Sequence, residues 1–241
     1  MKGFSAVTTL NRTAMSDSQI AIIDYGMGNL FNVQCACASV GLQSVVTADK
    51  KVIQASRGMI LPGVGAFGDA MNNLKKLDLV GVIKDHVAEG KPFFGICLGI
   101  QLLLSESEEF GTHKGLDIIK GRVVRFRNRD ESGRLIKVPQ VGWNQIRLED
   151  GHLASQEDGF ILRNIPNGEY MYFVHSYYAV PEDQSVALTM TDYEGTEYCS
   201  SLLKGAIFAT QFHPEKSGVE GLKIYQNWAQ VILASEEQVN K

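Results

Sequence analysis

The chain has 241 residues, 44% hydrophobic and 21% charged, proportions that exclude a collagen-like, low-complexity or disordered protein. With 23 basic and 27 acidic residues the net charge is -4, and no run of Lys or Arg could follow a phosphate backbone, so we expect no nucleic-acid partner. The longest apolar stretch, residues 92–104, is shorter than the roughly 20 residues that cross a bilayer. We therefore expect no membrane helix.

The first 18 residues differ in composition from the rest of the chain. They are rich in Ser and Thr and lack the apolar segment of a secretory signal, so we expect residues 1–18 to be a flexible leader and residues 19–241 to form one domain. Met15 is an equally good start. Four irregularly spaced cysteines indicate no disulfide framework and a reducing compartment, for which the cytoplasm is the default. Cys35 and Cys37 would face different sides of a helix, so we expect no zinc site, and no cofactor is indicated.

The first half of the chain alternates short apolar runs with helical segments. Residues 20–23 are apolar throughout, as in a strand buried on both faces of a parallel sheet, and Asn29 is a good N-cap for a helix ending at Gly41. Further strands are expected at residues 42–46, 59–61 and 93–96, and helices at residues 30–40, 67–74, 79–89 and 98–105. The alternation predicts a doubly wound, mostly parallel α/β sheet flanked by helices.

The second half of the chain predicts an additional antiparallel section. Strand-like runs separated by turns occupy residues 122–126, 145–148, 170–178, 186–191, 198–203 and 207–211. A final amphipathic helix, residues 218 to about 234, should pack Leu222, Tyr225, Trp228 and Ile232 inward.

A Gly-x-Cys-x-Gly sequence marks Cys97 as a candidate nucleophile. It lies between an apolar strand and a helix, and Gly95 and Gly99 permit the sharp turn of a nucleophile elbow. The start of a helix favours the thiolate, the reactive form of cysteine. The competing interpretation is a small buried hydrophobic residue, the usual fate of a free cysteine.

One histidine has the sequence context of a general base. Five histidines are present: His86, His113, His152, His175 and His213. His213 follows an apolar strand, and Glu215, two residues on, could hold one ring nitrogen while the other faces the thiol, as a catalytic triad requires. A surface His–Glu pair is the alternative, which the cysteine elbow makes the weaker one.

Two backbone segments are candidates for an oxyanion hole. The N–H of Leu98 directly follows the nucleophile, and the Gly63-Val64 peptide belongs to a Gly-rich turn, residues 62–65, at the end of a neighbouring strand. The same turn would serve equally well as a tight connection between strand and helix.

Nucleotide-binding motifs are incomplete in this chain. Gly26 and Gly28 begin a dinucleotide fingerprint, but Phe31 occupies the position of its third glycine, and there is no Walker A lysine. We expect no nucleotide site.

Three separated segments, FGICLGIQ, LPGVGAFG and TQFHPEKS, together resemble the class I glutamine amidotransferases. The resemblance implies the fold of that family and a Cys–His–Glu triad in this order. Carried over by position, Cys97 is the nucleophile, His213 the general base and acid, and Glu215 the residue that orients the histidine.

The same resemblance implies a binding site for the substrate L-glutamine. Gln101 matches a family residue that contacts glutamine, and Gly65 and the backbone around Ser176 and Tyr177 help to hold it.

Within that family, the segments DYGMGN, VPQVGWN and YFVHSY resemble the glutaminase subunits of imidazole glycerol phosphate synthase, from about residue 19 to the last helix. The resemblance implies that ammonia from glutamine is channelled to a (β/α)8-barrel cyclase subunit in histidine biosynthesis. It makes Trp143, Asn144, Tyr172 and Lys216 candidates for the partner interface. Trp143 and Tyr172 could instead be core aromatics.

One departure from the family pattern leaves the partner open. Histidine is common where this chain has Gln140, so a titratable group beside the interface is lost. Similar glutaminases feed ammonia to sugar-modifying amidotransferases in surface-polysaccharide biosynthesis, which is the alternative partner.

Two further interpretations compete with a glutaminase. An α/β-hydrolase with a cysteine elbow would act on esters or lactones, but its acid normally precedes the histidine by many residues, whereas Glu215 follows by two. A catalytically silent docking or regulatory subunit is the other.

For a glutaminase, we hypothesise low activity until the barrel docks and the turn at residues 62–65 directs an N–H toward the oxyanion.

Overall fold

The computed structural model describes residues 20–148 and 161–239, with the side chains of the last helix described to residue 234. The leader expected at residues 1–18 and the candidate His152 lie outside the described residues.

Five parallel strands form one part of the sheet. Four were predicted from the first half of the chain, whereas the fifth, residues 207–210, was expected in the antiparallel section but pairs in parallel with residues 93–96. In spatial order the five strands are β2 (Ser44–Thr47), β1 (Ile20–Ile23), β3 (Gly58–Gly63), β4 (Phe93–Cys97) and β14 (Ile207–Thr210). Every residue of β1, β3, β4 and β14 is buried. This explains why these strands read as continuous apolar runs rather than alternating ones.

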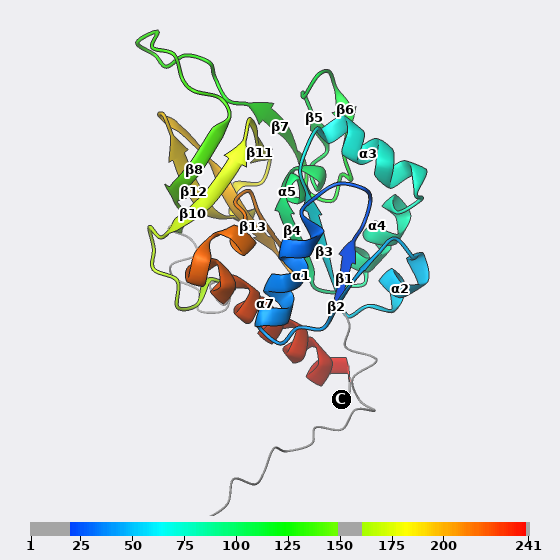
Figure 1. Ribbon diagram of the computed structural model, residues 1–241. Coiled ribbons are helices and arrows are strands. Elements are labelled where there is room, and N and C mark those ends of the chain that lie inside the picture. Colours follow the sequence, from blue (N-terminus) through cyan, green and yellow to red (C-terminus); the bar gives the residue numbers. More distant parts are fainter. Residues whose placement is uncertain (1–19, 149–160, 240–241) are drawn as a thin grey trace, which may run out of the picture.

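The sheet continues beyond β14 as the predicted antiparallel section. Next in order come β13 (Thr196–Lys204), β11 (Tyr177–Pro181), β7 (Gly121–Arg125), β5 (Glu106–Ser107) and β6 (His113–Lys114). All of these pairs are antiparallel except β5 with β7, and off this path β12 (Ala187–Tyr193) pairs with β13 while β9 (Arg147–Leu148) pairs with β12. A separate antiparallel pair, β8 (Gln140–Gln145) and β10 (Tyr170–His175), lies beside them (Figure 1). The fold expected from the sequence is confirmed.

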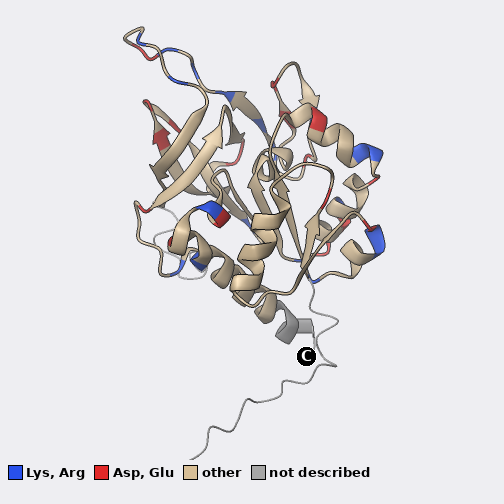
Figure 2. Cartoon of the chain, viewed as in Figure 1, with Lys and Arg blue, Asp and Glu red and all other residues tan. Residues whose placement is uncertain are grey.

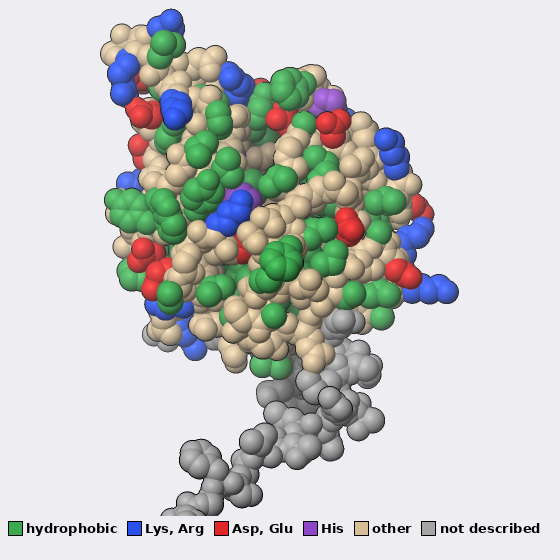
Figure 3. Space-filling view, in the orientation of Figure 1, with side chains coloured by type: hydrophobic (Ala, Val, Ile, Leu, Met, Phe, Trp, Pro, Cys, Tyr) green, Lys and Arg blue, Asp and Glu red, His purple; other side chains and the backbone are tan. Residues whose placement is uncertain are grey.

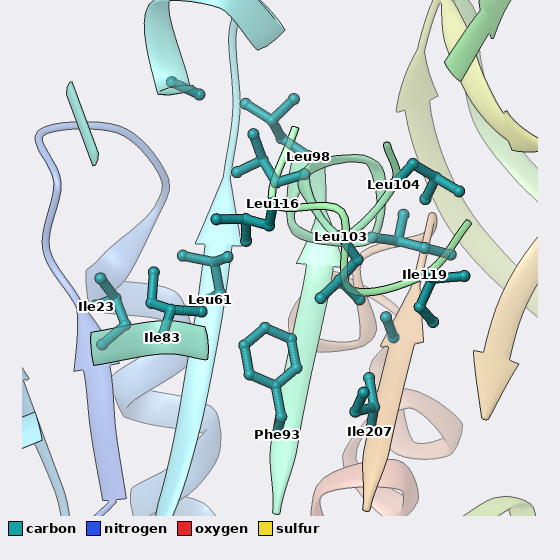
Figure 4. Close-up of a cluster of buried hydrophobic side chains, with 14 of the residues drawn as sticks. Ile23, Leu61, Ile83, Phe93, Leu98, Leu103, Leu104, Leu116, Ile119 and Ile207 are labelled. Atoms are coloured by element: carbon teal, nitrogen blue, oxygen red, sulfur yellow. The ribbon is translucent and has the colours of Figure 1, made fainter. Parts of the chain in front are cut away.

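Helices cover both faces of the parallel strands. The elements are α1 (Leu30–Ser39), α2 (Lys50–Ala55), α3 (Phe67–Lys76), α4 (Val80–Ala88), α5 (Leu98–Leu102), the 3-10 turns η2 (Gln184–Val186) and η3 (Pro214–Lys216), and α7 (Gly218–Val239). One face packs against α1 and α7. The rings of Tyr225 and Trp228, both in α7, lie 5.5 and 5.6 Å from the ring of Phe94 in β4. The other packs against α2, α3 and α4, where Phe93 and its neighbours fill the core (Figure 4).

Most predicted elements in the first half are confirmed, with two corrections. Asn29 caps α1 as expected, its side chain accepting a hydrogen bond from the N–H of Asn32. The short helix α2, capped by Asp49, was not expected. The helix predicted over residues 98–105 ends at Leu102, because the carbonyls of residues 102–104 accept hydrogen bonds from the backbone of residues 116–119.

Two corrections concern strands of the second half. The run predicted as one strand over residues 170–178 is two, β10 and β11, which separate at Ser176 and pair with different strands. The strand predicted at residues 145–148 instead spans the junction between β8 and β9.

Candidate active site

Cys97 ends β4 in a strained elbow. Its φ of 55° lies in the left-handed region, which a residue with a Cβ adopts only at a cost. A Cβ on Gly99 would lie 2.0 Å from the carbonyl oxygen of Leu61, so the elbow packs against β3 only because residue 99 is glycine. This is the geometry expected of a nucleophile held rigidly at the start of a helix.

The His213–Glu215 pair forms at the end of β14, the parallel neighbour of β4. The Nδ1 of His213 lies 2.8 Å from the Oε1 of Glu215, and their side chains are only 3% and 1% exposed. Pro214 starts the η3 turn that brings the two residues together. The pair is therefore a buried hydrogen-bonded unit and not the surface pair that was the alternative.

The electrostatics of His213 connect it to Cys97. Burial acts to lower the pKa of His213, but the negative charges of the Cys97 thiolate and Glu215 outweigh burial and raise the pKa to about 10. The Nε2 of His213 is buried and forms no hydrogen bond of standard geometry within the described residues. One ring nitrogen is thus held by a carboxylate, and the other is left for the sulfur and the substrate.

The Gly-rich turn lies beside the elbow because β3 pairs with β4, with Gly63 opposite Cys97. The hydroxyl of Tyr25 donates a hydrogen bond of 2.9 Å to the carbonyl of Pro62 and anchors the start of the turn. A Cβ on Gly63 would lie 2.2 Å from that hydroxyl. The structure thus brings Gly63 and Val64 next to Leu98, as an oxyanion hole requires.

A cavity of about 210 Å³ opens between the elbow and the turn. Its lining includes a residue of each predicted oxyanion segment and every residue expected to bind glutamine. The lining residues are Val64, Gly65, Cys97, Leu98, Gln101, Val174, His175, Ser176 and Tyr177. The amide of Gln101 donates to the carbonyl of Tyr177 at 2.8 Å and to Oε1 of Gln211 at 3.0 Å. The cavity is therefore polar on one side and leads directly to the sulfur.

Gln211 was not singled out from the sequence. It is fully buried, and its Nε2 donates to the Sγ of Cys97 at 3.8 Å. A polar side chain just beyond an apolar strand was the only signal in the sequence.

The candidate interface residues do not all share one surface. Trp143 is 55% exposed, and its ring lies 6.2 Å from that of Tyr172. The Nζ of Lys216 lies 5.8 Å from the centroid of the same tyrosine ring. Trp143 is thus not a core aromatic. Asn144 points to the opposite face of β8, where it donates to the carbonyl of Asp192 at 2.7 Å. Figure 3 shows hydrophobic side chains around a basic and a histidine patch over η3.

Gln140 lies in the core rather than beside the interface. It is 2% exposed and pairs with His175 across β8 and β10. Residues alternate between the two faces of a strand, and Gln140 falls on the buried one, so any effect on a partner would act through the core.

Other kinds of site find no support among residues 20–148 and 161–239. No group of three or more metal-binding side chains occurs in this part of the chain. None of its helices has the length and apolarity needed to cross a membrane. Figure 2 shows Lys and Arg interspersed with Asp and Glu over the described surface.

Comparison with known proteins agrees with this geometry. Residues 21–230 match the family "Glutamine amidotransferase class-I". The chain is 50% identical over 210 residues to imidazole glycerol phosphate synthase subunit HisH of Syntrophotalea carbinolica, covering 87% of this chain and 98% of that one. It is 47% identical to HisH of Aquifex aeolicus, covering 86% and 94%. The structure of PurLQS from Thermotoga maritima shares the fold, with a TM-score of 0.64 and 19% identity over 90% of this chain and 99% of that one. The chain belongs to the class I glutamine amidotransferases and, within them, to the family of the HisH subunits of imidazole glycerol phosphate synthase.

Proposed function

We propose that this chain is the glutaminase subunit of an imidazole glycerol phosphate synthase, with Cys97, His213 and Glu215 as its catalytic triad. The observation that carries the proposal is the cavity in which the elbow sulfur, the Gly-rich turn and the Gln101 amide meet. The four free cysteines accord with a cytoplasmic location.

The reaction follows from the positions of these groups. The Cys97 thiolate attacks the side-chain amide carbon of L-glutamine, and the resulting oxyanion is held by the N–H of Leu98 and an N–H of the Gly63-Val64 turn. His213 protonates the amide nitrogen of glutamine, and the C–N bond breaks. Ammonia departs, and a γ-glutamyl thioester remains on Cys97. Water, deprotonated by the same histidine, then hydrolyses the thioester to glutamate and restores the thiolate.

Glu215 holds His213 in one orientation through both steps. With Nδ1 bound to the carboxylate, Nε2 remains the nitrogen that exchanges protons with the substrate. The pair is buried, so the imidazolium that donates this proton is stabilised by the adjacent carboxylate.

The outer face of β8 and β10 suits a docking surface for a cyclase barrel. Val141, Trp143 and Tyr170 are each more than half exposed there, and Val64, at the mouth of the cavity, is 40% exposed. Exposed apolar side chains gathered on one face mark an interaction site. A partner seated on this face would cover the mouth and receive ammonia before water protonates it.

Docking would also complete the oxyanion hole. Gly65 has a φ of 106°, so the turn contains a residue that tolerates a peptide reorientation at low cost. We therefore propose that glutaminase activity is low in the isolated chain and rises when the partner binds.

The test is glutamate production by the chain alone and with its cyclase subunit, using Cys97→Ser and the exposed Cys35→Ser as a matched control. Glutamate formed by wild type and Cys35→Ser but not by Cys97→Ser supports the proposal. Ester turnover without glutamate production would favour a hydrolase, and co-purification with a sugar-modifying amidotransferase would identify a different ammonia acceptor. If the isolated chain matches the complex in rate, the gating proposal is wrong.

A further inference from the structure

Three buried polar side chains form a network behind the cavity that the proposed chemistry does not use. Gln140 and His175 face each other across β8 and β10 on the buried side of the pair, and Tyr198 of β13 lies between them. The Tyr198 hydroxyl is 3.0 Å from Oε1 of Gln140 and 3.2 Å from Nε2 of His175. On the far side of the ring, Nδ1 of His175 lies 2.9 Å from the carbonyl oxygen of Tyr177.

The protons of this network can be placed by counting donors. A carbonyl oxygen only accepts, so Nδ1 of His175 must carry a proton to bond Tyr177. Burial lowers the pKa of His175 to about 3, so the ring is neutral and Nε2 carries no proton. Nε2 then accepts from Tyr198, whose single proton is used. The neighbouring Thr191 hydroxyl donates to the carbonyl of Gln145 and has no proton left for Tyr198.

The orientation of the Gln140 amide follows from this count. With the Tyr198 proton directed to His175, the amide must donate. We therefore infer that the amide is turned by 180° about its last side-chain bond, so that Nε2 takes the place of Oε1 beside the tyrosine hydroxyl. The opposite orientation leaves the amide nitrogen buried with no acceptor among the described residues. An amide placed with its nitrogen toward Tyr198 removes this unpaired donor, which is the costlier group to bury unpaired.

We propose that Gln140, Tyr198 and His175 form a one-directional hydrogen-bond relay that positions the Ser176–Tyr177 backbone against substrate glutamine. This inference rests on the proposed glutaminase function. The relay ends at the Tyr177 carbonyl, which also accepts from Gln101, so both of its lone pairs are filled by buried donors. Such a carbonyl cannot rotate without losing two hydrogen bonds. The three are positioning residues, since the relay reaches substrate only through that backbone.

The proton placement is tested without any activity measurement. Long-range proton–nitrogen correlation spectra of the full chain, with histidine labelled by nitrogen-15, should show His175 protonated at Nδ1 and unprotonated at Nε2 at neutral pH. In Gln140→Glu the carboxylate can only accept, so it takes the Tyr198 proton. Nε2 of His175 then stays unprotonated but loses its hydrogen bond, which moves its nitrogen-15 resonance, while Nδ1 keeps its proton. A wild-type ring protonated at Nε2 overturns the relay whether or not the chain is a glutaminase.

The positioning role is tested by kinetics of the full chain with its cyclase subunit. Tyr198→Phe should raise KM for glutamine about fivefold, the effect of one hydrogen bond, and change kcat less than about twofold, because the backbone binds substrate and transition state alike. Tyr193→Phe is the matched control, because Tyr193 belongs to the same aromatic cluster but donates to Lys137, away from the cavity.

A second pair of variants keeps the role testable if Tyr198→Phe fails to fold. His175→Asn retains a donor for the Tyr177 carbonyl and should raise KM less than His175→Leu, which has none. Equal KM values for Tyr198→Phe and Tyr193→Phe, or for the two His175 variants, would overturn the positioning role. Loss of glutamate production in the wild type would instead overturn the proposed function.

Discussion

Replacing Gly99 with alanine should distort the nucleophile elbow, although the change adds only one methyl group. The added Cβ would lie 2.0 Å from the carbonyl oxygen of Leu61, whereas real Cβ contacts essentially never fall below 3.0 Å. The backbone of α5 at Gly99 and that of β3 at Leu61 must therefore separate by about 1 Å, the difference between these two distances. The Leu61 oxygen belongs to the backbone and the position of a Cβ is fixed by its own backbone, so no side-chain rotation can relieve the contact.

The magnitude follows from two opposing effects. Overpacking of this kind costs about 1–3 kcal/mol or more, while alanine in place of glycine near the start of a helix returns about 0.5–1 kcal/mol. We expect a net loss of about 2 kcal/mol, or roughly 4–8 °C in Tm for a chain of this size. The separation also moves Cys97 away from the Gly63-Val64 turn opposite it, and a 1 Å misplacement costs about 100-fold in rate.

Gly81→Ala is the matched control. Gly81 is likewise the second residue of a helix, α4, but no atom lies within 4 Å of the position of its Cβ. Its variant should be as stable as the wild type or slightly more stable, with unchanged kcat. Thermal unfolding and glutamate production are measured for both variants. If Gly99→Ala and Gly81→Ala behave alike, the packing of the elbow against β3 does not set the position of the nucleophile.

Three further predictions follow from the contacts of the site. Tyr25→Phe removes the hydrogen bond that anchors Pro62, so kcat in the complex should fall about fivefold at unchanged KM, and a changed KM with constant kcat in steady-state assays would contradict this. Trp143→Ala should weaken binding of the cyclase subunit by about 2 kcal/mol without lowering Tm, and a calorimetric titration with unaltered affinity would exclude this face. Denaturation at a series of pH values should show stability falling by up to about 5 kcal/mol between pH 6.5 and 3, because the unfolded chain protonates at His175 and the folded one does not; His175→Asn should flatten this slope.

The sequence predicted the parallel half of the fold well because its signals are local. Strands β1 and β4 are buried on both faces, so each appears as an uninterrupted apolar run followed by a Gly-rich turn. The elbow and the His213–Glu215 pair are equally local, since each depends on residues within two positions of one another. Short spacing allowed their chemistry to be inferred without the fold.

The antiparallel half was harder to predict because its limits depend on tertiary pairing. No glycine or proline marks the break at Ser176, where the chain passes from pairing with β8 to pairing with β7. The relay of Gln140, Tyr198 and His175 joins three segments that are distant in sequence. No local pattern distinguishes a buried glutamine on the inner face of a strand from an exposed one at an interface.

The most direct test of the central claim is the site at which a glutamine-mimicking electrophile modifies the chain. Peptide mass spectrometry of the full chain with its cyclase subunit should find the adduct on Cys97, and excess glutamine should prevent it. The exposed Cys35 should stay unmodified, because it does not line the cavity that would hold the glutamine mimic. An adduct on Cys35 but not on Cys97, or labelling of Cys97 that glutamine does not reduce, would contradict the assignment of Cys97 as the nucleophile of a glutamine site.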